Sequence, residues 1–288
     1  MTESNQTLGI PIGKPVETVA IAVKKAAIRC RIVSTGQPVT FRIVRREVEG
    51  EILTIIPSKV WRYQNTHYMT GEVVSERIDI PALNLEPLGL NEMGEWDPEE
   101  YFEELDPSLY RYFESIIDFG VRKSFEMDQI IPFQDPEDFS NDPITEASYL
   151  NECGKHAEAL KIIEKLLTTD LRCLDAHAHL GNWEFNLTDE HFEMFIDKAK
   201  RHYEVGTRIG ELSLGKDFSG LLSWRHINNR PFFRCMHGYG LSLWRLGQME
   251  DARKVFEKML WLNPVDNQGI RFLLADIDNG QTWYESNN

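Results

Sequence analysis

The sequence predicts an α+β protein, in which a small β-containing N-terminal domain precedes an all-α stack of helical hairpins. Runs of β-branched residues separated by turn residues occupy positions 39–80 and favour strands. Apolar residues at spacings of three and four recur beyond position 141 and favour amphipathic helices. We expect three regions: a small α+β or partial-barrel domain (1–90), an acidic helical linker (91–140), and helical repeats with a C-terminal capping helix (141–288).

The net charge of −15 is concentrated in the middle of the chain. Residues 81–140 hold 16 Asp and Glu against 3 Lys and Arg, whereas residues 1–80 have a net charge of +3. Because nucleic acids are polyanions, this acidity disfavours non-specific nucleic-acid binding by the whole chain.

The four cysteines, Cys30, Cys153, Cys173 and Cys235, are widely spaced and form no CxxC pair. They therefore predict reduced thiols rather than a zinc site or a disulfide framework. The N-terminus lacks the basic and apolar regions of a signal peptide, and no apolar run approaches the ~18 residues of a membrane span. We expect cytoplasmic residence and no membrane partner.

In the N-terminal domain, Pro15 and frequent alanines favour a helix over residues 16–32. The β-branched content leaves a strand near 28–33 as the alternative. Strands are expected at Val39–Arg46, at Ile52–Ile56 (ending before Pro57) and at His67–Ile80.

Basic and aromatic side chains interleave in this domain, and they raise RNA binding as an alternative function. They are Arg42, Arg45, Arg46, Lys59, Trp61, Arg62, Tyr63 and Tyr68. Small β-domains stack nucleic-acid bases on such aromatic side chains and bind the phosphates with such cations. The competing interpretation is that the aromatics pack a loop against the sheet while the cations form a solvated face, and the regional charge of +3 favours this interpretation.

The acidic middle contains two helix starts. Asp97-Pro98 and Asp106-Pro107 each pair a capping side chain with a first-turn proline. The second start predicts an amphipathic helix over 109–124. The clustered acids Glu99, Glu100, Glu103 and Glu104 are interpreted as a solvated helix face, because no His or Cys lies nearby to complete a catalytic or metal site.

A helical hairpin is clearest at residues 233–264. Its first apolar face contains Met236, Tyr239, Gly240, Leu243 and Leu246, and its second contains Ala252, Val255, Phe256, Met259 and Leu262. Gly247 marks the turn between the helices, and Pro264 ends the second helix. A helix-interior glycine costs roughly 1 kcal/mol relative to alanine, so Gly240 predicts a close approach of the partner helix.

This hairpin resembles a tetratricopeptide repeat, a 34-residue unit of two helices. Counted from Phe233, the small residues of the motif fall on Gly240 and Ala252, the aromatic residue on Phe256 and the proline on Pro264. Met236 and Met259 depart from the Trp and Ala that are usual in the family. An ordinary helical hairpin is the alternative.

Two weaker units precede this one, and a capping helix is expected after it at 267–277. The unit 141–173 begins at Asp142-Pro143, an N-cap followed by a first-turn proline. The unit 174–212 places Leu180-Gly181, Ala199 and Tyr203 at the family's apolar, small and aromatic positions, with an insertion around 186–191.

The resemblance implies a concave groove lined by the first helix of each unit. The corresponding residues here are Asp175, Asn182, Phe185, Asn186, Arg234, His237, Trp244 and Arg245. Such a mixture suits an extended peptide with an acidic group or a terminal carboxylate. Only Asn182 and Arg234 fit the family's carboxylate clamp, and Gly238 occupies a position that should donate, so the clamp itself is not expected. The expected function is peptide or protein binding without catalysis, cofactor or metal.

Two further hypotheses concern segments outside the hairpins. The connection 217–232 is longer than repeat geometry requires, and its candidates for an enzymatic site or for packing are Trp224, Arg225, His226 and Arg230. The acidic segment 91–140 precedes a groove that contains Arg234 and Arg245, so it is also a candidate internal ligand for that groove.

Overall fold

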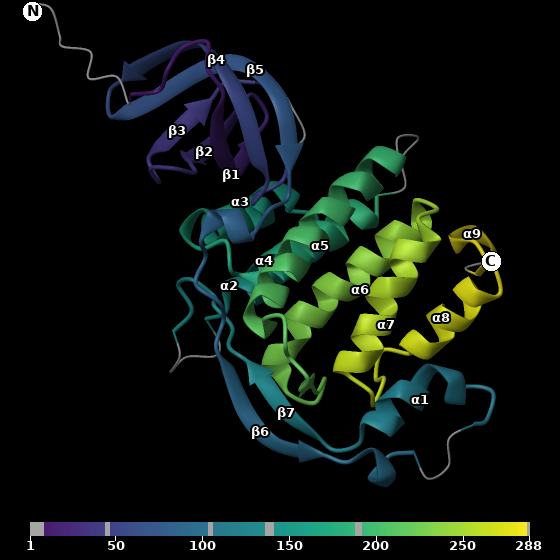
Figure 1. The fold of residues 1–288 in the computed structure, drawn as a ribbon. Coiled ribbons are helices and arrows are strands. Elements are labelled where there is room, and N and C mark those ends of the chain that lie inside the picture. Colours follow the sequence, from purple (N-terminus) through teal and green to yellow (C-terminus); the bar gives the residue numbers. More distant parts are fainter. Residues whose placement is uncertain (1–8, 44–46, 103–105, 136–140, 188–191, 287–288) are drawn as a thin grey trace, which may run out of the picture. The chain divides into compact units, whose positions relative to one another are not determined.

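The computed structural model describes residues 9–43, 47–102, 106–135, 141–187 and 192–286. It confirms the α+β class, because an N-terminal β-barrel precedes a helical C-terminal half (Figure 1). The chain forms two compact units, Met1–Glu86 with Ile131–Ala176 and Pro87–Ile130 with His177–Asn288. Among the described helices, none combines the length and apolarity that crossing a membrane requires.

The first unit contains a closed barrel with the strand order β1-β2-β3-β5-β4. Its strands are β1 (Val16–Lys24), β2 (Ala27–Ile32), β3 (Pro38–Phe41), β4 (Ile52–Tyr63) and β5 (Thr66–Arg77). Neighbouring strands run antiparallel, except for β3 and β5, which are parallel. Cys30, Phe41, Leu53, Ile55 and Met69 are fully buried in its core.

The prediction of a helix over residues 16–32 is wrong, because this stretch forms the β1–β2 hairpin. In β2, Ile28, Cys30 and Ile32 are buried while the residues between them are exposed, which is the period-two pattern of a strand. The strand alternative near 28–33 is therefore correct. Pro57 does not end β4, since the β4–β5 register shifts between Pro57 and Lys59 and a proline is tolerated at such a bulge.

The first helical hairpin belongs to the same unit as the barrel. It consists of α2 (Pro143–Glu152) and α3 (His156–Thr169). The Asp142 carboxylate accepts from the Ile144 backbone N–H, which confirms the predicted cap. After α3, Leu171 packs with Val19 and Ile21 of β1. The hydroxyl of Thr168 donates to the carbonyl of Ile21 at 3.3 Å. These contacts attach the hairpin to the barrel wall.

The second unit contains most of the remaining helices. They are α5 (Phe192–Leu214), α6 (Arg230–Arg245), α7 (Met249–Leu262), α8 (Ile270–Asp278) and α9 (Trp283–Ser286), preceded by α4 (Leu174–Phe185), which begins in the first unit. Helices α5, α6, α7 and α8 pack in succession (Figure 1). Phe256 of α7 contacts Gly240 of α6, where a Cβ would approach the ring closer than real Cβ atoms allow. The close approach predicted from Gly240 is therefore present.

Part of the acidic middle forms a sheet in this unit. The strand order is β6 (Leu90–Trp96), β7 (Arg122–Met127) and β8 (Leu221–Leu222), with β7 central. Asp97 caps the short 3-10 helix Pro98–Glu100. The helix expected over 109–124 is present as α1 (Tyr110–Phe119) but ends at Gly120. The φ of Gly120 is 80°, a backbone conformation that glycine adopts without steric cost.

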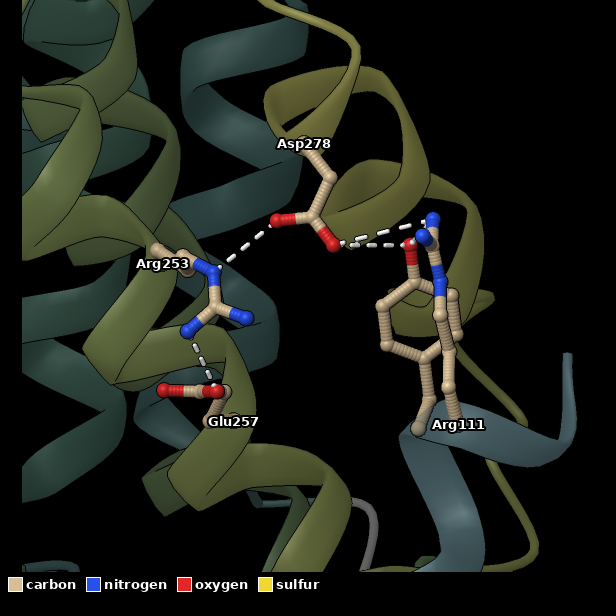
Figure 2. Close-up of polar contacts among 5 residues, drawn as sticks. Arg111, Arg253, Glu257 and Asp278 are labelled. Atoms are coloured by element: carbon tan, nitrogen blue, oxygen red, sulfur yellow. Dashed lines mark hydrogen bonds and ion pairs between the residues drawn. The ribbon is translucent and has the colours of Figure 1, made fainter.

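Helix α1 is attached to α7 and α8 through Asp278 (Figure 2). Nε of Arg253 donates to Oδ1 of Asp278 at 2.9 Å, and the hydroxyl of Tyr112 donates to Oδ2 at 3.0 Å. The guanidinium of Arg111 forms an ion pair with the same carboxylate at 3.7 Å. Arg253 also donates to Glu257 at 2.6 Å. The network joins side chains from three helices.

Candidate functional site

A cleft of about 350 Å³ in the second unit contains most of the predicted groove residues. Asn182, Phe185, Asn186, Arg234 and His237 all line it, together with Tyr203, Trp224, Gly238, Leu241 and Gln268. The predicted residues come from α4, from the residue directly after it, and from α6. The first helices of two hairpins thus contribute to one surface.

Tyr203 of α5 supports the floor of this cleft. Its ring contacts Gly181 of α4 and Gly238 of α6, where added Cβ atoms would overlap it. Its hydroxyl donates to Oδ1 of Asn182 at 2.6 Å. Burial raises the pKa of Tyr203, so the hydroxyl stays protonated and remains a donor. Because Oδ1 of Asn182 is used internally, its amide NH₂ is the group left to donate to a ligand.

The charge in the cleft comes from α6. Burial lowers the pKa of His237 to about 4, so its imidazole is neutral at pH 7. The imidazole also packs edge-on against Phe256, with ring centroids 6.3 Å apart. Arg234 is exposed on the same helix and is the cationic side chain among the described residues that line the cleft. One cation among neutral amides suits a polar ligand with an acidic group.

Three predicted groove residues do not line this cleft. Trp244 is only 1% exposed, and its Nε1 donates to the carbonyl of Gln281 at 3.0 Å. Arg245 donates to the carbonyl of Phe185 at 3.0 Å, with its guanidinium 5.0 Å from that ring. Asp175 is buried at the start of α4. Trp244 and Arg245 therefore hold neighbouring segments in place.

The four loop candidates have different surroundings. Trp224 lines the cleft, and its backbone N–H donates to Oδ1 of Asn263 at 3.1 Å. Arg230 donates from Nε to the carbonyl of Trp224 at 3.1 Å, and its guanidinium lies 5.4 Å from the indole. Arg225 and His226 line a different cleft. Arg230 therefore packs the loop, whereas the other three residues line clefts.

Arg122 of β7 was not singled out from the sequence, yet it fixes the beginning of this loop. Its side chain is nearly fully buried and donates to the carbonyls of Ser219 at 2.9 Å, Trp261 at 2.7 Å and Gly220. The guanidinium also lies 4.0 Å from the Trp261 ring. Burial lowers the pKa of Arg122 to about 10, which keeps it charged at pH 7. No sequence signal points to this role, because Arg122 falls within the helix predicted over 109–124 and β7 was not expected there.

Asn229 fixes the end of the loop and was also missed. It is fully buried, and its Oδ1 accepts from the Met127 backbone N–H at 2.8 Å. Its Nδ2 donates to the carbonyls of Phe125 and Ser223, both at 2.9 Å. The loop is therefore ordered against β7, and this order positions the side chains between its two ends.

The basic and aromatic residues of the barrel largely contact one another. Trp61 and Tyr68 stack with ring centroids 5.5 Å apart. Arg42 lies 5.2 Å from the Tyr68 ring, and Lys59 lies 5.4 Å from the Trp61 ring. Tyr63 is exposed, and Arg62 donates to the carbonyl of Gln64. Arg45 and Arg46 lie outside the described residues. Trp61 and Tyr68 thus lie on the paired strands β4 and β5, half-buried, and they do not pack a loop against the sheet. RNA binding through this cluster stays an untested alternative.

The acidic middle does not line the cleft in the part of it that the structure describes, residues 91–102 and 106–130. Helix α1 is instead bonded to Asp278 through Tyr112 and Arg111. The hypothesis that this segment serves as an internal ligand is therefore wrong for those residues. Among the described residues, no three His, Cys, Asp or Glu side chains cluster as metal ligands would.

Comparison of the chain with protein-family models, with curated proteins and with solved structures found no significant match.

Proposed function

We propose that the protein binds an extended peptide, or an extended segment of a partner protein, in the cleft between α4, α5 and α6. In this proposal it is a tetratricopeptide-like interaction module that acts in the cytoplasm without a catalytic step. The observation that carries the proposal is the convergence of Asn182, Phe185, Asn186, Arg234 and His237 on one cleft. The cytoplasmic setting rests on the sequence alone.

Equivalent packing in two hairpins supports a repeat architecture. The resemblance pairs Gly181 with Tyr203 in one unit and Gly240 with Phe256 in the next. Each glycine lies directly against its aromatic partner, with no space for a Cβ. Stacked hairpins that pack in this way present their first helices on a common surface, which is where repeat proteins bind their ligands.

The chemistry of the wall determines which peptide it fits. The amides of Asn182, Asn186 and Gln268 can hydrogen-bond to the main chain of an extended segment. Arg234 adds a cation that pairs with an Asp, a Glu or a terminal carboxylate. Phe185 supplies an apolar surface for one side chain. We therefore expect an acidic peptide with a single apolar anchor.

Capture of the full chain's partners, followed by peptide mapping, tests this proposal. The captured proteins are identified by mass spectrometry, and overlapping peptides from them are titrated against the full chain by calorimetry. Arg234→Glu reverses the charge of this side chain in the cleft. It should lower the affinity for the selected peptide by about tenfold or more.

A matched control is available on α7. Lys254 is exposed, makes an ion pair with Asp251 at 3.0 Å, and does not line the cleft. Lys254→Glu makes the same charge change there and should leave peptide affinity within about twofold of the wild type. Equal effects of the two substitutions, or unchanged partners in Arg234→Glu, would exclude the cleft as the binding site.

A further inference from the structure

A second cleft, of about 420 Å³, lies in the same unit between the β6–β7–β8 sheet, the loop after β8 and the segment after α7. Its size falls within the range of small-molecule sites. None of its lining residues also lines the first cleft. Any ligand of this second cleft is thus separate from the proposed peptide.

The indole of Trp96 provides a buried donor in this wall. Trp96 is 6% exposed and stacks on Tyr101 with ring centroids 5.6 Å apart. Its Nε1–H is buried, and no acceptor for it exists among the residues that the structure describes. Buried N–H groups are nearly always paired in native proteins. Trp96 lines the cleft, so a ligand atom that reaches Nε1 from there would supply the missing acceptor.

Further donors line the same cleft. Asn263 accepts from the Trp224 backbone N–H through Oδ1, so its amide NH₂ is its other polar group. Ser124 supplies a hydroxyl, and His226 a half-buried imidazole. Arg225 is exposed at the wall, and none of the described carboxylates forms an ion pair with it. The wall therefore offers mainly donors and one permanent cation.

Glu95 is the acidic side chain among the described lining residues. It is exposed on β6, and it disfavours a ligand whose negative charge is spread over its whole surface. A ligand with one compact anionic end avoids this repulsion while reaching the donors.

We propose that this cleft binds a small molecule through a compact oxyanion, a carboxylate or a phosphate, held by Nε1–H of Trp96 and the guanidinium of Arg225. Both groups are suited to such an acceptor, because the indole N–H only donates and arginine forms charge-assisted pairs with carboxylates and phosphates. The stacked rings of Trp96 and Tyr101 bound the apolar part of the ligand.

Nuclear magnetic resonance of the indole N–H groups tests the site in the full chain. Benzoate and phenyl phosphate serve as probes, because they carry the two oxyanions on the same ring. Trp96→Phe identifies the Trp96 signal by its loss. A saturable shift of that signal is expected with at least one probe below about 10 mM, the range of weak small-ligand binding.

Arg225→Gln should lower the affinity for the probe that shifts the Trp96 signal by about tenfold. Lys216→Gln removes an exposed cation on the segment before β8 that does not line the cleft and should change the affinity by less than about twofold. The indole signals of the tryptophans other than Trp96 and the adjacent Trp224 should keep their wild-type positions in Arg225→Gln, which shows that the fold is intact.

The outcomes separate the two ligand sources. A response to benzoate alone assigns a carboxylate, a response to phenyl phosphate alone assigns a phosphate, and a response to both assigns a general oxyanion site. The proposal is overturned if neither probe moves the Trp96 signal, or if Arg225→Gln and Lys216→Gln bind equally well.

Discussion

Phe256 lies so close to Gly240 that a Cβ at position 240 would be less than 3.0 Å from atoms of its ring. Gly240 lies in the interior of α6, where glycine is costly for helix formation. The contact explains the residue, because only the absence of a side chain lets α7 approach to this distance. The same relationship holds between Tyr203 and Gly181.

Gly240→Ala should therefore destabilise the second unit although it raises helix propensity. The propensity gain is about 1 kcal/mol, whereas overpacking a core typically costs about 1–3 kcal/mol. We expect a net loss in the free energy of unfolding, measured by urea denaturation. The double variant Gly240→Ala/Phe256→Leu should show a smaller loss than the two single losses added together. Strict additivity would contradict the proposed contact.

Arg122→Met should strongly destabilise the second unit. It leaves the carbonyls of Ser219, Gly220 and Trp261 without their donor. A buried acceptor that loses its donor costs about 1–3 kcal/mol, and this substitution affects three of them. Hydrogen exchange at the amides of β8 measures the local effect, and urea denaturation measures the global one. The neighbouring Lys123→Met removes an exposed ion pair with Glu92 and should leave the free energy of unfolding nearly unchanged, because exposed pairs are screened by solvent.

These residues also show what the sequence could and could not predict. Asp142 and Gly240 act through neighbours in the same hairpin, so local patterns identified the helix start and the close approach. Arg122 acts through carbonyls about 100 and 140 positions away, and no local pattern encodes them. The β1–β2 hairpin was mistaken for a helix because frequent alanine obscured the alternation of buried and exposed residues in β2.

The candidate site was predictable to the extent that it depends on helix periodicity. Positions on the first helices of two hairpins identified Asn182 and Arg234 correctly as neighbours of one cleft. Trp244 and Arg245 share that periodicity but are covered by the C-terminal segment, because Trp283 packs against both. That packing depends on the fold of distant residues. The second cleft draws on strands and loops from three regions and had no sequence pattern.

Asp278→Asn should loosen α1. The substitution removes the negative charge that Arg253, Tyr112 and Arg111 share (Figure 2). Because this network is largely exposed, the expected loss is only about 0.5–1 kcal/mol. Faster hydrogen exchange across α1 should reveal it. Asp251→Asn makes the same charge change at the exposed pair with Lys254 and should leave α1 exchange unchanged. Equal hydrogen exchange across α1 in both variants would show that Asp278 does not stabilise α1.

His237 should make the stability of the second unit depend on pH. Burial lowers its pKa from 6.5 to about 4, so folding favours the neutral imidazole. The stabilisation is complete above pH 6.5 and declines as the pH falls toward 4, because the unfolded chain binds the proton first. At about pH 5 the loss relative to neutral pH is about 2 kcal/mol. Burial also lowers the pKa of His202, so the comparison must be between variants.

The test is the difference in unfolding free energy between the wild type and His237→Gln, measured across this pH range. His202 is present in both proteins and its contribution cancels. We expect His237→Gln to be less stable than the wild type at neutral pH, since Gln buries an amide beside Phe256. The difference in unfolding free energy between the two proteins should shrink as the pH falls. The reason is that only the wild type has a residue 237 whose protonation favours the unfolded chain. Parallel profiles from pH 7 to pH 4.5 would show that the imidazole reaches solvent and titrates normally.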